Sequence, residues 1–65
     1  MNIRTEMRKF REDMEMTQQQ MASAIGVSQG MIHLVEKGER ELGSKPIYKL
    51  HQLDPPRFPL DQLLQ

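Results

Sequence analysis

The chain has 65 residues, no cysteine, and nine basic and nine acidic side chains, so its formal net charge is zero. A chain of this length forms one small domain, and the absence of cysteine excludes disulfides and thiolate zinc sites. The zero net charge lowers the expected strength of non-specific nucleic-acid binding, although a local basic face remains compatible with it.

No apolar run approaches the roughly 20 residues of a membrane span, and the amino terminus lacks the apolar core of a signal peptide. We therefore expect a cytoplasmic chain with no membrane partner. The six methionines suit adaptable core packing better than metal ligation, and two histidines are too few for a metal cage. No metal ion or other cofactor is expected.

Apolar residues predict a first helix over about residues 3–14. Ile3, Met7, Phe10 and Met14 recur at spacings of four, three and four, which places them on one helical stripe. Acidic residues crowd the end of this segment, where they oppose the helix dipole. The helix is therefore expected to end near Met14.

The next two predicted helices cover about 18–25 and 28–37, on either side of Gly26. Thr17 and Gln20 have the spacing of a capping box, and Gly26 supplies the left-handed residue that ends a helix. Ser28 is a favourable cap for the helix that follows.

Two shorter helices are expected over about 45–53 and 59–64. Ser44 can cap the first of them, and Pro55-Pro56 separates the two because proline cannot continue a helix. No repeat or long linker interrupts this order. The sequence predicts an all-α fold, a single compact five-helix domain over residues 1–65.

The stretch 18–36 meets the physical demands of a helix-turn-helix motif. Ala22 is small enough to let two helices cross closely, and Gly26 can form the corner between them. Apolar residues fill the wedge between the helices, namely Val27, Ile32 and Val35.

In these positions the chain resembles the Cro/repressor (XRE-type) helix-turn-helix proteins, small regulators of phages and bacteria. The resemblance runs from about Met7 to Leu53, and the matching residues are Arg11, Thr17-Gln18, Ala22, Gly26-Val27-Ser28, Ile32, Glu36 and Gly38. It implies a lambda-repressor-like domain whose third helix reads the DNA major groove. It also implies a homodimer on palindromic double-stranded DNA, here a repressor of phage or mobile-element type.

Arg11 and Glu36 stand at the edges of apolar stripes, where a lone charge is costly. A bidentate ion pair between the first and third helices is therefore expected. The resemblance implies the same pairing, with a structural role.

Four residues of the third helix are candidates for contacts with DNA bases: Gln29, Gly30, His33 and Leu34. Gln29 is the first choice, because glutamine can pair with N6 and N7 of adenine. Gly30 either allows close approach of the backbone to DNA or weakens readout at that step. His33 is either a DNA contact or a solvated histidine, and Leu34 either meets thymine methyls or is buried against the fourth helix.

Six polar residues are candidates for contacts with the DNA backbone: Gln18, Gln19, Ser28, Lys37, Arg40 and Lys45. Gln18 opens the second helix, where free amides and an amide side chain can face a phosphate. Its alternative role is that of an exposed, helix-starting glutamine. Glu39 and Glu41 bracket Arg40 and depart from the basic loop that the resemblance implies, so the salt dependence of binding is expected to be modest.

Four apolar residues near the carboxyl end are expected to form a twofold dimer interface: Phe58, Leu60, Leu63 and Leu64. The alternative function is a protein-interaction module with weak or no DNA binding, such as an antitoxin or an anti-repressor partner. The neutral charge, the acidic loop and Gly30 favour this alternative.

An enzyme is not expected, and neither is a small-molecule ligand. His51 lies near Asp54 in the sequence, but a catalytic dyad also needs a nucleophile and a pocket. His51 is therefore expected to be a solvated surface histidine.

Overall fold

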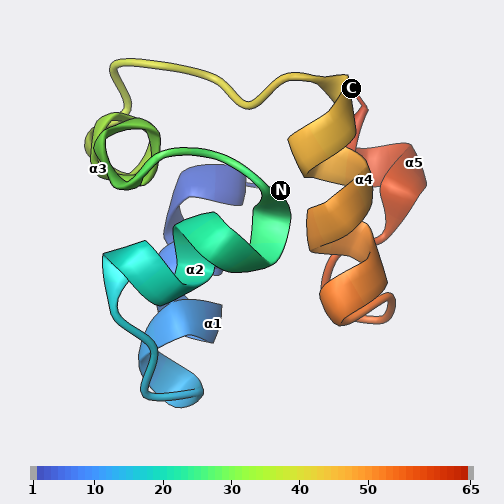
Figure 1. The fold of residues 1–65 in the computed structure, drawn as a ribbon. Helices are drawn as coiled ribbons and strands as arrows, with labels where there is room; N and C mark the ends of the chain where they lie inside the picture. Colours follow the sequence, from blue (N-terminus) through green and yellow to red (C-terminus); the bar gives the residue numbers. More distant parts are fainter. Residues whose placement is uncertain (1, 65) are drawn as a thin grey trace.

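The computed structural model describes residues 2–64, which form five α-helices and no β-strand. The helices are α1 (Ile3–Asp13), α2 (Gln18–Ile25), α3 (Gln29–Lys37), α4 (Ser44–Leu53) and α5 (Leu60–Leu63). Figure 1 shows α1, α2 and α3 on one side of the molecule and α4 and α5 on the other. The expected all-α, five-helix fold is confirmed. Residues 1 and 65 of the expected domain lie outside the described residues.

Side chains cap the amino-terminal ends of the first three helices. Asn2, Thr17 and Ser28 each accept a hydrogen bond from a backbone N–H in the first turn of the following helix. At α2 the cap is a full capping box, because the Gln20 side chain accepts in return from the Thr17 N–H at 2.8 Å. Ser44 was expected to cap α4, but it is the first residue of that helix, and Gly43 stands at the N-cap without a side-chain bond.

The same backbone motif ends α1, α2 and α3. In each, one residue takes a left-handed conformation, and the N–H of the next residue donates to a carbonyl five positions earlier. The left-handed residues are Glu15 (φ 55°), Gly26 (φ 75°) and Gly38 (φ 82°). Glycine adopts this conformation without strain, whereas glutamate does not. The end of α1 is therefore the strained one of the three.

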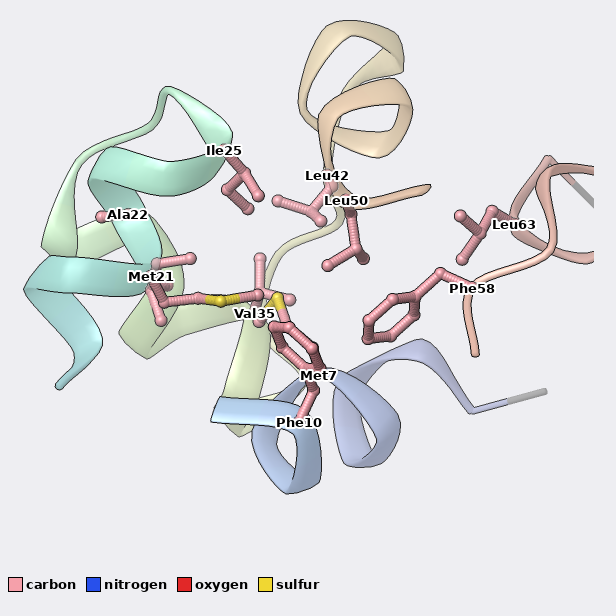
Figure 2. Close-up of a cluster of buried hydrophobic side chains, with 11 residues drawn as sticks. Met7, Phe10, Met21, Ala22, Ile25, Val35, Leu42, Leu50, Phe58 and Leu63 are labelled. Atoms are coloured by element: carbon pink, nitrogen blue, oxygen red, sulfur yellow. The ribbon is translucent and has the colours of Figure 1, made fainter. Parts of the chain in front are cut away.

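One hydrophobic core joins the five helices (Figure 2). Its buried members are Met7, Phe10, Met21, Ala22, Ile25, Ile32, Val35, Leu42, Leu50, Phe58 and Leu63. Leu42 enters it from the segment between α3 and α4, and Phe58 from the turn before α5. The rings of Phe10 and Phe58 meet edge to face with centroids 5.4 Å apart. The turn after α4 thus completes the core against α1.

The predicted dimer interface is wrong at two of its four positions. Phe58 is fully buried and Leu63 is 7% exposed, so both side chains belong to the core of the single chain. The physical reason is the small size of the domain, which needs its large apolar side chains to cover one core. Leu64 is 54% exposed and Leu60 is partly buried, so the apolar surface that remains is smaller than expected.

Candidate nucleic-acid interface

Helices α2 and α3 form a helix-turn-helix whose second helix lies at the edge of the molecule (Figure 1). Ala22 is buried in α2, and Ile32 and Val35 anchor α3 in the core. Gly26 makes the corner in its left-handed conformation. One face of α3 is thereby fixed to the core and the opposite face is left to solvent.

Arg11 of α1 and Glu36 of α3 form a bidentate ion pair. The guanidinium donates from Nε to Oε2 at 2.8 Å and from Nη2 to Oε1 at 3.1 Å. The two side chains are only 15% and 7% exposed, so solvent screens the pair weakly. The hydrogen bond to Glu36 is the main reason why the pKa of Arg11 is raised above its already high ordinary value. Arg11 therefore stays charged over the whole range of pH in which such a domain is studied.

Two further bonds extend the ion pair to the start of α2. Arg11 Nη1 donates to the Met16 carbonyl at 3.0 Å, and Gln18 Nε2 donates to Glu36 Oε1 at 3.2 Å. The network thus joins the end of α1, the start of α2 and the last turn of α3. The bond from Gln18 to Glu36 was not anticipated from the sequence. It fixes the orientation of a side chain for which the sequence predicts either a phosphate contact or an exposed, helix-starting role.

The candidate base-contact residues lie together on the outer part of α3. Gln29, Gly30 and His33 are exposed, and Leu34 is partly buried. Gln29 is the first residue of the helix, directly after the Ser28 cap. Leu34 therefore has part of its surface left for contact with a ligand, in addition to its packing within the chain.

The motif is almost free of charge. From Met16 to Val35 the sequence contains no Asp, Glu, Lys or Arg, and His33 is the one titratable side chain. Neither α2 nor α3 has an acidic residue in its first turn. The first turns of α2 and α3 therefore contribute no carboxylate beside their free N–H groups, and the Glu36 carboxylate that lies next to Gln18 is paired with Arg11. The starts of both helices thus suit an anionic partner.

The candidate backbone contacts surround this neutral surface. Gln19 and Ser28 are exposed, and the Ser28 hydroxyl accepts from the Met31 N–H at 3.1 Å as the cap of α3. Lys37, Arg40 and Lys45 are also exposed. The Lys37 ammonium lies 3.0 Å from a Glu39 carboxylate oxygen, so part of its charge is already neutralised.

Two cations that the sequence did not single out lie against the ends of the motif. The Lys49 ammonium is so close to Gly26 that a Cβ at this glycine would come within 2.9 Å of it. Arg4 Nη1 donates to the Lys37 carbonyl at 3.4 Å, beside Gly38. Lys49 thus lies at the carboxyl end of α2, and Arg4 lies at the carboxyl end of α3. Positive charge is favourable at both places. The spacing of Lys45 and Lys49 on one helix was the signal that could have pointed to Lys49.

His51 differs from its expected role as a solvated surface residue. It is partly buried, and its Nδ1 lies 2.7 Å from the Phe58 carbonyl oxygen. The contact ties α4 to the turn that carries Phe58, and the role of His51 is therefore structural. Within residues 2–64, no group of three or more His, Cys, Asp or Glu side chains is arranged to hold a metal ion.

Residues 7–53 match the model of a family described as helix-turn-helix. No significant match to a curated protein or to a solved structure was found. In the part of the chain that the structure describes, no helix has the length and apolar character needed to cross a bilayer.

Proposed function

Because the chain belongs to the helix-turn-helix family of the Cro/repressor (XRE) type, we propose that it is a sequence-specific transcriptional repressor. In this proposal α3 enters the major groove of an operator, and bound protein blocks access to the DNA. The activity belongs in the cytoplasm of a phage-infected or bacterial cell, where such DNA lies.

The observation that carries this proposal is the exposed, uncharged face of α3 on a rigid support. Ile32 and Val35 fix the helix from beneath, and the ion pair of Arg11 with Glu36 fixes its rotation about its axis. A site that reads bases needs such support, because small displacements of the contacting groups weaken directional hydrogen bonds.

Gln29 is proposed as the main base contact. It stands in the first turn of α3, the part of the recognition helix that meets base edges in this class of motif. Its amide can accept from N6 and donate to N7 of one adenine, a pairing worth about 1–3 kcal/mol of discrimination. His33 and Leu34, one turn further along, are proposed as secondary contacts.

The backbone contacts are proposed at both ends of the motif. Gln18 has a second amide hydrogen beyond the one that it donates to Glu36, and this hydrogen can bind a phosphate while Glu36 holds the side chain in place. Gln19 and Ser28 add polar contacts, and Lys37, Arg40 and Lys45 supply charge. About three cations are then in reach of phosphates. A plot of the logarithm of affinity against the logarithm of salt concentration should therefore have a slope of roughly −3 per subunit.

We also propose that the protein acts as a homodimer on a palindromic operator. The partly exposed Leu60 and Leu64 offer apolar surface for a twofold contact, while Phe58 and Leu63 support them from within the core. Two recognition helices in such a dimer would lie about 34 Å apart, one turn of DNA.

One observation favours a second candidate function, a protein-interaction module with little DNA binding. The ion pair of Lys37 with Glu39 and the exposed Glu41 reduce the positive charge of the segment after α3. Under this alternative the same neutral face of α3 would contact a protein partner.

Selection of bound sequences from a random duplex pool at low salt separates the two candidates. The repressor proposal expects enrichment of a palindrome with half-sites separated by one helical turn. Gln29→Ala should lose the preference at one base position, and Gln52→Ala, a matched change at an exposed position of α4, should keep it. A pool that stays random for the wild-type protein would contradict the repressor proposal and support the interaction module.

A further inference from the structure

A pocket of about 380 Å³ lies between α1 and α3, beside the helix-turn-helix motif. Its lining residues come from one face of α1 and from the last turn of α3: Arg4, Thr5, Arg8, Lys9, Glu12 and Glu36. Glu36 has a structural role in its ion pair with Arg11. Arg8 and Lys9, in contrast, serve neither the packing of the core nor the DNA contacts proposed for α2 and α3.

The pocket carries an excess of positive charge. Arg11 binds both oxygens of Glu36, so the charge of that carboxylate is already neutralised. Three cations then line the pocket against one remaining carboxylate, and two positive charges are left over: Arg4, Arg8 and Lys9 against Glu12. The zero net charge of the chain conceals this local basic site. The pocket therefore suits an anion.

Two of the three cations are available to a ligand. Arg8 Nε lies 3.7 Å from a Glu12 oxygen, beyond ordinary hydrogen-bond length, and the Arg8 side chain is 61% exposed. Lys9 is exposed, and no carboxylate of the described residues forms an ion pair with it. The Arg4 guanidinium instead lies against the carboxyl end of α3, where a Cβ at Gly38 would collide with it. Arg8 and Lys9 are therefore the candidate ligands, and Arg4 adds positive charge at the end of the pocket.

The place of the pocket on α3 links it to DNA. Glu36 lies seven residues after Gln29, about two helical turns, so both belong to the same flank of α3. Glu36 also accepts a hydrogen bond from Gln18, a proposed phosphate contact at the start of α2. A helix with its side chains is about 10–12 Å wide and the major groove about 12 Å, so a helix in the groove has a phosphate backbone along each flank. The pocket thus lies on a flank of α3 along which a backbone would pass.

We propose that this pocket binds a phosphate of the DNA backbone, with Arg8 and Lys9 as its ligands. The inference rests on the proposed DNA-binding function and extends the contacted surface to α1. The planar guanidinium of Arg8 can donate two parallel hydrogen bonds to phosphate oxygens, and the Lys9 ammonium adds a compact charge. Glu12 opposes the anion, so the site predicts that removing this carboxylate strengthens the binding of DNA.

The test compares variants of opposite expected effect on the duplex that the wild-type protein selects. Arg8→Gln should bind roughly fivefold more weakly, and the slope of the logarithm of affinity against that of salt concentration should become shallower by about 1. Lys9→Gln should act in the same direction. Glu12→Gln should bind roughly twofold to fivefold more tightly, a gain that partial unfolding does not produce. Lys49→Gln and Asp61→Asn make the same charge changes at exposed positions of α4 and α5 and should leave the affinity nearly unchanged.

Sequence specificity provides a second readout. A phosphate contact carries no sequence information, so Arg8→Gln should weaken binding to the selected duplex and to a random duplex by the same factor. Gln29→Ala, in contrast, should weaken binding to the selected duplex alone. A loss in Arg8→Gln that was confined to the selected duplex would overturn the phosphate role.

Three further results separate the remaining possibilities. Unchanged affinity and salt slope in Arg8→Gln would overturn the site on α1 and leave DNA binding by α3 intact. Saturable binding of inorganic phosphate to the free protein, together with that unchanged DNA affinity, would assign the pocket to a free anion and overturn the proposal. If the wild-type protein bound no duplex, the proposed DNA-binding function would fail, and the site on α1 with it.

Discussion

The nine-residue helix α3 has an inner face, which packs against the core, and an outer face, which is open to solvent. The two faces serve different functions. The inner face carries Ile32 and Val35 in the core and Glu36 in a mostly buried ion pair. The outer face carries Gln29, Gly30 and His33, all exposed. Stability and recognition should therefore be separable by single substitutions on the same helix.

The largest effect is expected at the centre of the inner face. Ile32 is fully buried, so Ile32→Ala should lower the free energy of unfolding by about 2–5 kcal/mol through lost burial and a cavity. Urea denaturation followed by circular dichroism measures this loss. His33→Ala, the neighbouring change on the outer face, should stay within about 0.5 kcal/mol of the wild type. If the two variants lost equal free energy of unfolding, the inner and outer faces of α3 would not differ in their contribution to stability.

The next effect concerns the ion pair that sets the rotation of α3. Arg11→Met leaves the Glu36 carboxylate mostly buried with Gln18 as its remaining donor, and it should cost about 2–4 kcal/mol. The double variant Arg11→Met/Glu36→Met should recover much of this stability, because the unpaired charge is gone. Chemical denaturation of the two variants provides the comparison. A double variant no more stable than Arg11→Met would show that the unpaired carboxylate is not the source of the cost.

A change at Gln29 should lower the affinity for DNA without lowering the stability of the domain. Gln29→Ala should reduce affinity for the selected duplex by about 1–3 kcal/mol and leave the free energy of unfolding within about 0.5 kcal/mol of the wild type. Fluorescence anisotropy with the labelled duplex measures the first quantity, and urea denaturation the second. Unchanged affinity would remove Gln29 from the recognition surface.

The smallest effect lies outside α3, at the strained end of α1. Glu15→Gly should stabilise the domain by about 1 kcal/mol, because glycine takes the left-handed conformation without strain. Glu15→Ala removes the same charge but keeps the strain, so the difference in melting temperature between the two variants isolates the backbone term. If the glycine and alanine variants were equally stable, the claim that the backbone of Glu15 is strained would be contradicted.

Local patterns were enough to predict the helices and the pairing across the motif. Apolar spacing, the Thr17 cap and Gly26 act within a few residues, and the structure has the helix boundaries within one residue of the expected ranges. The position of two opposite charges beside apolar stripes predicts the pairing of Arg11 with Glu36, and the two side chains lie in contact.

Features that depend on long-range packing were not predictable in the same way. Phe58 belongs to the core because the turn after α4 brings it onto Phe10, and no spacing in the sequence carries that information. The contact of His51 with the Phe58 carbonyl follows from the same turn. The bond from Gln18 to Glu36 depends on how α2 and α3 cross, which apolar periodicity does not specify.

We propose that the outer face of α3 and the start of α2 make the main contacts with DNA while the rest of the chain holds them in place. Titration of the selected duplex into isotope-labelled protein, followed by amide chemical shifts, tests this claim. We predict the largest shift changes at Gln18, Gln19 and residues 28–34, with small changes over α5. Large changes confined to α4 and α5, with the amides of α3 unmoved, would contradict the claim.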